Sequence, residues 1–348
     1  MQPDDSPYPG SVMVPDISVC VANYNGGGLV LDCLASVFAQ EGGFTLEVLV
    51  HDDASTDDSL KDIRRHYPDA RILASETNCG FCISNNRMVE ASRGRFVLLL
   101  NNDAVLRPGS VQRLVEFSRD GHGGDIAGLP QYSMTDGMLV DRGYRTDPFL
   151  NPIPVLETAT HEVGVATGAC LWIPRTTWNA VGGFPPWFES VAEDIFVCMA
   201  ARVQGHRVFV LDQPGFDHWV GKNLGGGKLV AGRLRTTARR RALSERNKTF
   251  AMLCCYPWPV LLGLLPLHAL LLMIESAFLF ITGMGPGKVA AIYAPIPAAV
   301  WHHRDDIREC RRRLMQQRRA TTGELFAFTR WFPRKLAMLV RHGRPQVQ

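Results

Sequence analysis

Short apolar runs alternate with segments of helical periodicity along the stretch that follows Asp16. Strands that alternate with helices are typical of βαβ units, so this pattern predicts a parallel sheet. The expected strands are residues 17–22, 47–51, 71–75 and 96–100, and the expected helices are residues 29–40, 59–66 and 85–92.

Two of the runs, residues 46–50 and 96–100, are apolar almost throughout, as is typical of strands covered on both faces. An Asp-Asp pair follows the first run after a single His, and an Asn-Asn-Asp triplet follows the second directly. Because open α/β sheets bind ligands at the carboxyl edge of their strands, the pattern predicts a binding edge with carboxylates on it.

The pattern is less regular between residues 121 and 165, where frequent Gly, Asp and Pro predict loops and edge strands without a separate core. Residues 164–174 predict a further strand. Residues 193–204 have apolar positions at helical spacing, and Gly205 is a typical helix stop. Residues 221–227 predict a Gly-rich loop.

An apolar segment of 26 residues without formal charge, residues 249–274, follows this region. A membrane helix needs about 20 residues, but Pro257, Pro259 and Pro266 are expected to interrupt it. Only about 16 residues, or roughly 24 Å of helix, remain between Pro266 and Gly283, against a hydrocarbon core of about 30 Å. The alternatives are a membrane surface segment and a buried helical hairpin.

The composition is globular, because 46% of the 348 residues are hydrophobic and 20% are charged; disorder and coiled coil are excluded. A net charge of +3 argues against nucleic acid as a partner. Residues 219–250 hold nine basic and one acidic residue, and residues 301–348 hold twelve and four, so each stretch carries +8. Basic stretches on both sides of an apolar segment favour an anionic membrane surface.

The first fourteen residues contain no Lys or Arg and no long apolar core, which predicts a chain that starts in the cytosol. Nine Cys residues in a cytosolic chain do not indicate a disulfide framework. Cys79 and Cys82 have the spacing of a redox or zinc motif, but no second such pair completes a tetrahedral site. The sequence therefore favours small buried thiols over thiol chemistry at these positions.

Two nucleotide-binding motifs are incomplete in this sequence. A dinucleotide GxGxxG that begins at Gly26 requires Gly or Ala at the position of Leu31. A P-loop that ends at Gly227-Lys228 requires Gly at the position of Lys222 and Ser or Thr at that of Leu229.

What remains is a set of acids at the sheet edge. Carboxylates that face a diphosphate require a divalent cation between them, usually Mg²⁺ or Mn²⁺. Asp103, in the turn after a buried strand, is the expected ligand, and a turn-forming Asp that caps the helix near Pro108 is the alternative.

Several short motifs, in this order and spacing, resemble the family 2 glycosyltransferases and within them the bacterial rhamnosyltransferase-like branch. The resemblance extends over residues 16–225, and the later Arg246-Asn247-Lys248 is similar to the carboxyl end of that branch. The motifs are residues 18–25, 52–57, 78–81, 85–86, 99–103, 182–184 and 193–194, and His218.

The resemblance implies a GT-A fold: an α/β, Rossmann-like, mixed but mostly parallel sheet with a helical, partly apolar C-terminal extension. It implies a tail at 1–15, a catalytic domain at 16–248 and a membrane-associating region at 249–348. It also implies a nucleotide-sugar donor, a divalent metal and inversion at the anomeric carbon.

By position, Asp52 and Asp53 would contact the base and ribose of the donor, and Asn102 and Asp103 occupy the DxD position. Asp194 matches the general base, and His218 matches a position near the metal or diphosphate. The expected donor-binding residues are Asn23, Tyr24, Asn25, Asp52, Asp53, Asn102 and Lys222; the catalytic residues are Glu193 and Asp194; the metal ligands are Asp103 and His218.

Alternatives exist for the last of these motifs. Glu193-Asp194 could instead stabilise a helix N-terminus, and His218 could be a hydrogen-bonded core residue beside Trp219. Lys222 and Asn223 either close over the donor or belong to a solvated loop. Pro185-Pro186 and Phe196 replace acids that are usual in the family, which leaves acceptor identity open.

The sequence thus predicts an inverting transferase that moves a sugar, with dTDP-rhamnose as first donor, to a lipid-linked or surface-glycan acceptor. Its expected place is the cytoplasmic side of the plasma membrane, as a peripheral or monotopic protein. The competing hypothesis is a non-catalytic nucleotide-sugar-binding subunit of a glycan-assembly complex.

Overall fold

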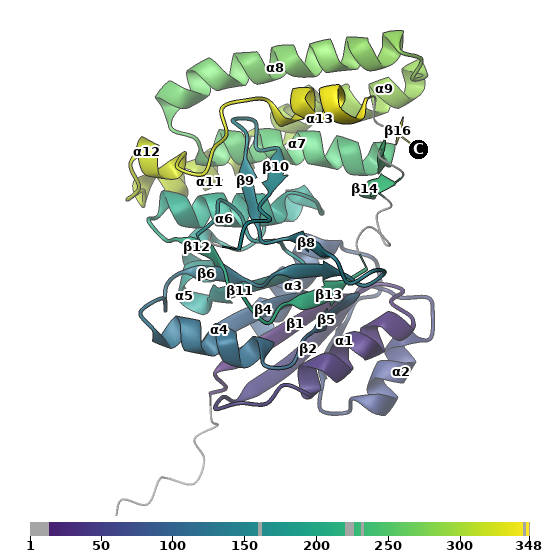
Figure 1. Ribbon diagram of the computed structural model, residues 1–348, viewed down its shortest axis with the longest axis vertical. Helices are drawn as coiled ribbons and strands as arrows, with labels where there is room; N and C mark the ends of the chain where they lie inside the picture. The colour runs from purple at the N-terminus through teal and green to yellow at the C-terminus, as the bar shows by residue number, and fades with distance from the viewer. Residues whose placement is uncertain (1–13, 159–161, 220–225, 231–232, 344–345, 348) are drawn as a thin grey trace, which may run out of the picture.

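A seven-stranded sheet lies at the centre of the lower part of the molecule (Figure 1). The computed structural model describes residues 14–158, 162–219, 226–230, 233–343 and 346–347. The strand order is β12-β6-β11-β4-β1-β2-β3, and only β11 runs antiparallel to its neighbours, which confirms the expected mostly parallel α/β sheet. The strands are β1 (Ile17–Asn23), β2 (Leu46–Asp52), β3 (Arg71–Ala74), β4 (Phe96–Asn101), β6 (Ile126–Gly128), β11 (Cys170–Pro174) and β12 (Val208–Val210).

Each face of the sheet carries its own hydrophobic core, because successive strand residues point to opposite faces. Ile17, Val19 and Val21 of β1 belong to one core, while Cys20 belongs to the other. Helices α1 (Gly28–Phe38), α2 (Ser59–His66) and α4 (Ser110–Arg119) contribute to the first core, and α3 (Phe81–Ala91), α5 (Arg175–Val181) and α6 (Glu193–Val203) contribute to the second.

A smaller four-stranded sheet lies beside the carboxyl end of β4, with the order β5-β13-β7-β8. In it, His218 of β13 pairs with Ala104 of β5, which brings His218 next to Asp103. The strands are β5 (Ala104–Leu106), β7 (Gln131–Ser133), β8 (Leu139–Asp141) and β13 (Phe216–His218), and β9 (Tyr144–Thr146) pairs with β10 (Pro152–Pro154).

Two details of the middle region differ from expectation. The prediction of edge strands between residues 121 and 165 is wrong for β6, which is an inner strand because β12, much later in the chain, pairs with its outer side. The strand expected over residues 164–174 is confined to Cys170–Pro174.

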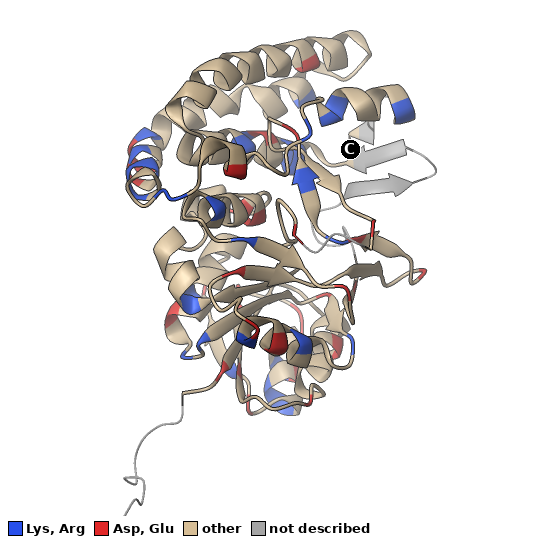
Figure 2. Cartoon of the chain, turned by 60° about the vertical axis from the view of Figure 1, so that its left-hand side comes forward, with Lys and Arg blue, Asp and Glu red and all other residues tan. Residues whose placement is uncertain are grey.

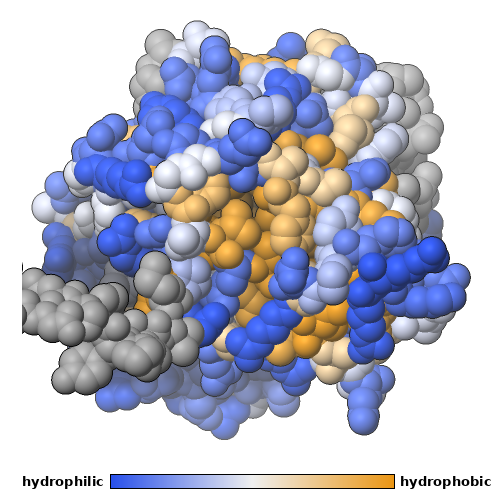
Figure 3. Space-filling view, turned by 90° about the horizontal axis from the view of Figure 1, so that it is seen from below, coloured by the Kyte–Doolittle hydropathy of each residue, from blue (hydrophilic) through white to orange (hydrophobic). Residues whose placement is uncertain are grey.

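The C-terminal part forms a helical layer above the sheet (Figure 1). Lys and Arg residues occur on several of its helices (Figure 2). Seen from below, the molecule shows hydrophobic side chains near the middle of its surface, with hydrophilic side chains around them (Figure 3). The elements are α7 (Ala238–Cys255), α8 (Trp258–Ile281), α9 (Pro286–Tyr293), α10 (Pro295–His302), α11 (Arg304–Gln316), α12 (Thr322–Leu325) and α13 (Arg334–His342), preceded by η1 (Pro186–Phe188), β14 (Gly226–Val230) and β15 (Arg233–Thr236) and followed by β16 (Gln346–Val347).

Helix α7 joins this layer to the sheet. The division expected between residues 248 and 249 falls inside α7, and Phe250, Ala251 and Met252 are fully buried in the same core as α6. The helical layer is therefore packed on the sheet domain through a shared core.

Helix α8 runs without a break for 24 residues, so the expected interruption at Pro266 is wrong. A proline inside a helix removes one hydrogen bond, here to the carbonyl group of Leu262, while the other residues can continue the helix. The helix is about 36 Å long at 1.5 Å per residue. By length and composition it is the one helix of the described residues that could cross a membrane, with mean hydropathy 2.1.

The segment that leads into α6 has a strained backbone. Glu189, Val191 and Ala192 have φ angles of 63°, 71° and 67°, a region that side-chain-bearing residues seldom adopt. Such residues cost on the order of 1–3 kcal/mol each and persist only where the surroundings hold them.

Asn247 of α7 holds this segment. Its amide nitrogen lies 2.8, 2.9 and 2.8 Å from the carbonyl oxygens of Phe188, Ser190 and Val191. The neighbouring Arg246 also donates to the carbonyl group of Phe188, at 3.1 Å. Because Asn247 is fully buried, water cannot replace these hydrogen bonds.

We expect Asn247→Asp to destabilise the protein by about 2 kcal/mol or more, because a buried carboxylate would face three carbonyl oxygens in place of a donor. Urea unfolding followed by circular dichroism measures the change. Gln316→Glu, the same chemical change at an exposed position of α11, is the matched control and should shift stability by less than about 0.5 kcal/mol. Equal stabilities of the two variants would contradict the role of Asn247.

Candidate active site

A cleft of about 1680 Å³ runs from the carboxyl edge of the sheet up to the helical layer. It is lined at its lower end by residues that follow β1, β2 and β4, in its middle by the start of α6, and at its upper end by α7, α8 and α13. The sequence-predicted site residues in its lining are Asn23, Tyr24, Asp53, Asn102, Asp103, Glu193, Asp194 and His218.

The lower end of the cleft rests on a buried network of hydrogen bonds. The amide group of Asn23 donates to the Oδ1 atom of Asp52 at 2.9 Å and accepts from the amide nitrogen of Asn102 at 3.1 Å. A Cβ atom at Gly26 would lie 2.3 Å from the Oδ1 atom of Asn23, so only glycine fits against this network. Asp52 is buried within this network and does not line the cleft.

The neighbouring acid faces the cleft. Asp53 accepts the backbone N–H groups of Cys79 and Gly80 at 2.7 and 2.9 Å. Tyr24 lies in the same part of the lining with half of its surface exposed, so its ring is available to stack on a planar group. Asn25 instead accepts the N–H group of Thr56 at 2.7 Å and supports the loop from outside the lining.

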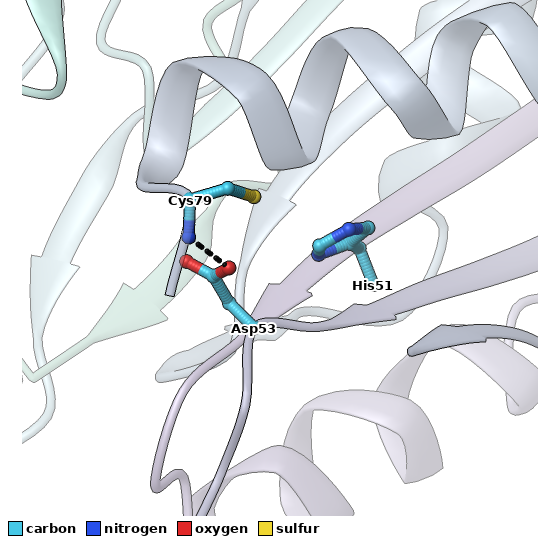
Figure 4. A group of neighbouring side chains, drawn as sticks. All are labelled: His51, Asp53 and Cys79. Atoms are coloured by element: carbon cyan, nitrogen blue, oxygen red, sulfur yellow. Dashed lines mark hydrogen bonds between the residues drawn. The ribbon is translucent and has the colours of Figure 1, made fainter. Parts of the chain in front are cut away.

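His51, Asp53 and Cys79 bring three potential metal-ligand atoms within 4.8 Å of one another (Figure 4). Both oxygen atoms of Asp53 already accept backbone N–H groups. Burial raises the pKa of the Cys79 thiol, and Arg87 lies 3.6 Å from its sulfur atom. A neutral thiol beside a guanidinium is a poor cation ligand, so this cluster better fits a role in fixing the loops at the lower end of the cleft.

Cys82, the second residue of the CxxC spacing, is fully buried in the hydrophobic core, whereas Cys79 is half-buried at the cleft. The expectation of a small buried thiol is confirmed for Cys82. The nearness of His51 could not be found from the sequence, because it depends on how β2 and the start of α3 meet.

Asp103 and His218 form a second pair of potential ligands. The Nε2 atom of His218 lies 3.0 Å from the Oδ1 atom of Asp103 and 3.4 Å from the Nδ2 atom of Asn101. Among the described residues, the buried Oδ1 atom of Asn101 and Nδ1 atom of His218 have no hydrogen-bond partner. A carboxylate and an imidazole in contact at the cleft, beside an amide oxygen that has no partner, are groups that can bind a divalent cation such as Mn²⁺ or Mg²⁺.

Asp194 begins α6 and faces the cleft with its carboxylate held by two backbone N–H groups. Gly168 donates to its Oδ2 atom at 3.0 Å, and Ile195 donates to its Oδ1 atom at 2.8 Å. Burial raises the pKa of Asp194, and these two hydrogen bonds oppose the rise because they stabilise the ionised form.

Glu193 differs from its neighbour. It is buried, its Oε2 atom has no partner among the described residues, and burial, together with the charge of Asp194, raises its pKa to about 8. Glu193 therefore holds its proton at neutral pH, and Asp194 is the acid of the pair that ionises first. Both carboxyl groups lie in the first turn of α6, where the helix dipole favours negative charge. This stabilisation is compatible with the different pKa values of the two acids.

Arg240 of α7 is a site residue that the sequence analysis did not single out. It lines the cleft, and its charge lowers the pKa of both Glu193 and Asp194, against the effect of burial. The only signal in the sequence was the basic run at residues 239–241, which we had interpreted as a membrane contact. Lys222, expected at the donor, lies outside the described residues.

Comparison with known families gives two matches. A model described as "Glycosyl transferase family 2" matches residues 18–171, and one described as "Glycosyl transferase family group 2" matches residues 96–301, more than half of the chain.

Curated relatives match over part of their length. The succinoglycan biosynthesis protein ExoO of Rhizobium meliloti is 35% identical over 116 residues, which are 33% of this chain and 32% of that protein. The hyaluronan synthase of Pasteurella multocida is 30% identical over 189 residues, 53% of this chain and 18% of that protein. The matched stretches thus span about a third of ExoO and less of the synthase.

Two solved structures share the fold. The mannosyltransferase PcManGT of Pyrobaculum calidifontis, in complex with GDP-Man and Mn²⁺, aligns with a TM-score of 0.52 at 19% identity, covering 91% of this chain and 86% of that one. GalNAc-T7 with UDP, GalNAc and Mn²⁺ aligns with a TM-score of 0.56 at 13% identity, covering 69% and 49%. These likenesses confirm the expected GT-A fold.

We expect Glu193→Gln to change how stability depends on pH. As pH rises from 4.5 toward about 8, the unfolded chain loses the Glu193 proton while the folded chain keeps it, so folding becomes less favourable. The variant has no proton to lose and should gain stability relative to the parent as pH rises. Urea unfolding at both ends of this range, with the exposed Glu309→Gln as control, measures the difference; parallel pH profiles would contradict the assignment.

Proposed function

The chain belongs to the family 2 glycosyltransferases, and on this basis we propose that it transfers a sugar from a nucleotide-sugar donor to an acceptor hydroxyl group with inversion at the anomeric carbon. The observation that carries the proposal is the placement of a potential cation site, Asp103 with His218, and a carboxylate, Asp194, on the walls of one cleft. An inverting displacement requires these two elements and no second catalytic carboxylate.

At the donor end, we propose that Tyr24 and Asp53 contact the base and ribose, while Asn23, Asn25, Asp52 and Asn102 keep the surrounding loops in place. When bound by Asp103 and His218, a divalent cation would neutralise the diphosphate that leaves. We retain dTDP-rhamnose as the first donor to test. UDP-linked sugars and GDP-mannose belong in the same screen, since solved neighbours carry UDP and GDP-Man.

At the acceptor side, we propose that Asp194 is the general base that takes the proton of the attacking hydroxyl group. Its backbone hydrogen bonds fix the carboxylate at the cleft wall, and Glu193, which keeps its proton, avoids a second negative charge there. Hydrogen bonds from Asn247 hold the strained turn before α6. The turn sets where the helix begins and therefore where Asp194 lies.

We further propose that the protein works at the cytoplasmic membrane surface without crossing the bilayer. Several outward residues of α8 are apolar and exposed, including Leu262 and Met273. Helices α7 and α11, on either side of α8 in the chain, pack against each other, which disfavours a single crossing. An in-plane helix with basic neighbours suits an anionic surface.

We expect Asp103→Asn to abolish the metal dependence of donor binding without unfolding the chain, because an amide is a much weaker cation ligand than a carboxylate. Calorimetric titration of UDP, dTDP and GDP with and without Mn²⁺ measures it, with the exposed Asp212→Asn as control. If the variant still showed the full response to Mn²⁺, the ion would have to bind elsewhere, for example at His51, Asp53 and Cys79.

We expect Asp194→Asn to bind donor normally and to lower the transfer rate by about 10²–10⁴-fold, the usual cost of losing a general base. Activity of the parent enzyme should fall in acid with an apparent pKa above the ordinary Asp range, because burial raises that of Asp194. Steady-state kinetics of Asp194→Asn and Glu193→Gln show which of the two residues acts as the base. An inactive Glu193→Gln beside an active Asp194→Asn would exchange them, and donor binding without any turnover would favour a non-catalytic subunit.

A further inference from the structure

Helix α8 is apolar on two faces, which is unusual for a helix at the surface of a protein. One face lines the cleft and the other is exposed to solvent. The cleft-lining residues of α8 recur at helical spacing and are His268, Leu271, Leu272, Ile274, Glu275, Phe278 and Leu279. Ile274 lies at the boundary of the two faces, because 55% of its surface is also exposed. The exposed residues on the other side include Leu262, Leu270, Met273 and Ile281, with 70, 48, 63 and 79% of their surface accessible.

Helix α13 supplies the facing wall of the upper cleft, where Leu336, Met338 and Leu339 belong to the lining. Its position is fixed by Lys335, whose Nζ atom lies 2.7 Å from Glu245 of α7 and 2.6 Å from Glu275 of α8. The two helices, labelled at the top of Figure 1, therefore line an upper arm of the cleft, in which apolar side chains lie beside the ion pairs of Lys335 with Glu245 and Glu275. We call this part of the cleft the apolar arm.

Basic residues in the first turn of α7 also line the cleft. Arg241 forms a salt bridge with Glu275 at 2.6 Å, so its charge is compensated. No carboxylate of the described residues lies within salt-bridge distance of Arg240. The charge of Arg240 lowers the pKa of Asp194, the proposed base.

We propose that the acceptor is a phosphate-linked lipid, whose hydrocarbon chain enters the arm between α8 and α13, whose phosphate binds Arg240, and whose sugar reaches Asp194. This inference rests on the proposed transferase activity. A free, water-soluble glycan would leave the apolar side chains of the arm wet and Arg240 without a salt bridge, whereas a lipid phosphate matches both. The exposed face of α8 lets the chain pass from a membrane to the arm with little contact with water.

The test uses geranyl phosphate, farnesyl phosphate and farnesol as probes, with the full chain and without detergent. We expect farnesyl phosphate to bind at least about tenfold more tightly than geranyl phosphate, because each additional buried methylene group raises the affinity several-fold. We also expect it to bind about tenfold more tightly than farnesol, through its phosphate. Dodecyl phosphate distinguishes the type of lipid chain. If it binds as tightly as farnesyl phosphate, the cleft accepts straight-chain lipids as well. If it binds more weakly, the cleft is selective for isoprenoid chains.

Two adjacent residues of α8 give a matched pair of variants. Leu272 lines the cleft and Met273 faces outward. We expect Leu272→Gln to remove the preference for the longer chain, while Met273→Gln leaves it intact and weakens flotation with phosphatidylglycerol vesicles. Arg240→Gln should remove the preference for phosphate over farnesol.

Equal binding of the three probes by the parent protein, or equal effects of the two α8 variants on chain-length preference, would overturn the proposal. Mn²⁺-dependent nucleotide binding and slow donor hydrolysis are measured on the same samples. Intact donor hydrolysis without lipid selectivity would remove only the acceptor proposal, and lipid selectivity without nucleotide binding would remove the transferase proposal itself.

Discussion

The hydrogen bonds from Asn247 to the turn before α6 connect the two parts of the molecule. The turn has a strained backbone that short-range interactions do not favour, and it sets the direction in which α6 presents Glu193 and Asp194. Because Asn247 belongs to α7, the geometry of the acid pair depends on the helical layer as well as on the sheet. Helix α7, which continues into the apolar region, thus helps to set the geometry of the cleft.

Burial raises the pKa of both acids of the pair, and their surroundings separate them. Two backbone N–H groups and Arg240 favour the charge on Asp194, while Glu193 has burial and a charged neighbour against it. The same cleft then joins a lower end with the carboxylates and the potential cation site to an upper end where apolar side chains of α8 and α13 lie beside ion pairs. The proposed acceptor, polar at one end and apolar at the other, matches both environments.

The sequence was sufficient for the parts of the fold that depend on local pattern. Continuous apolar runs predicted β2 and β4, and the residues after them predicted the binding edge with Asp103 on it. Features that depend on pairing between distant segments were beyond it: β6 becomes an inner strand only through β12, and the nearness of His218 to Asp103 requires β13 to pair with β5. The interruption expected at Pro266 is absent because the loss of one hydrogen bond does not stop the neighbouring turns from continuing the helix.

The position of Lys335 has a consequence for the order of events during synthesis. This residue, close to the end of the sequence, compensates the buried Glu245 and also binds Glu275. A nascent chain whose sheet domain has already left the ribosome still lacks α13, and with it one wall of the cleft. The wall that α13 contributes is therefore added only after the sheet domain has been made, so a chain that stops before α13 would retain the sheet and its carboxylates but not the complete cleft.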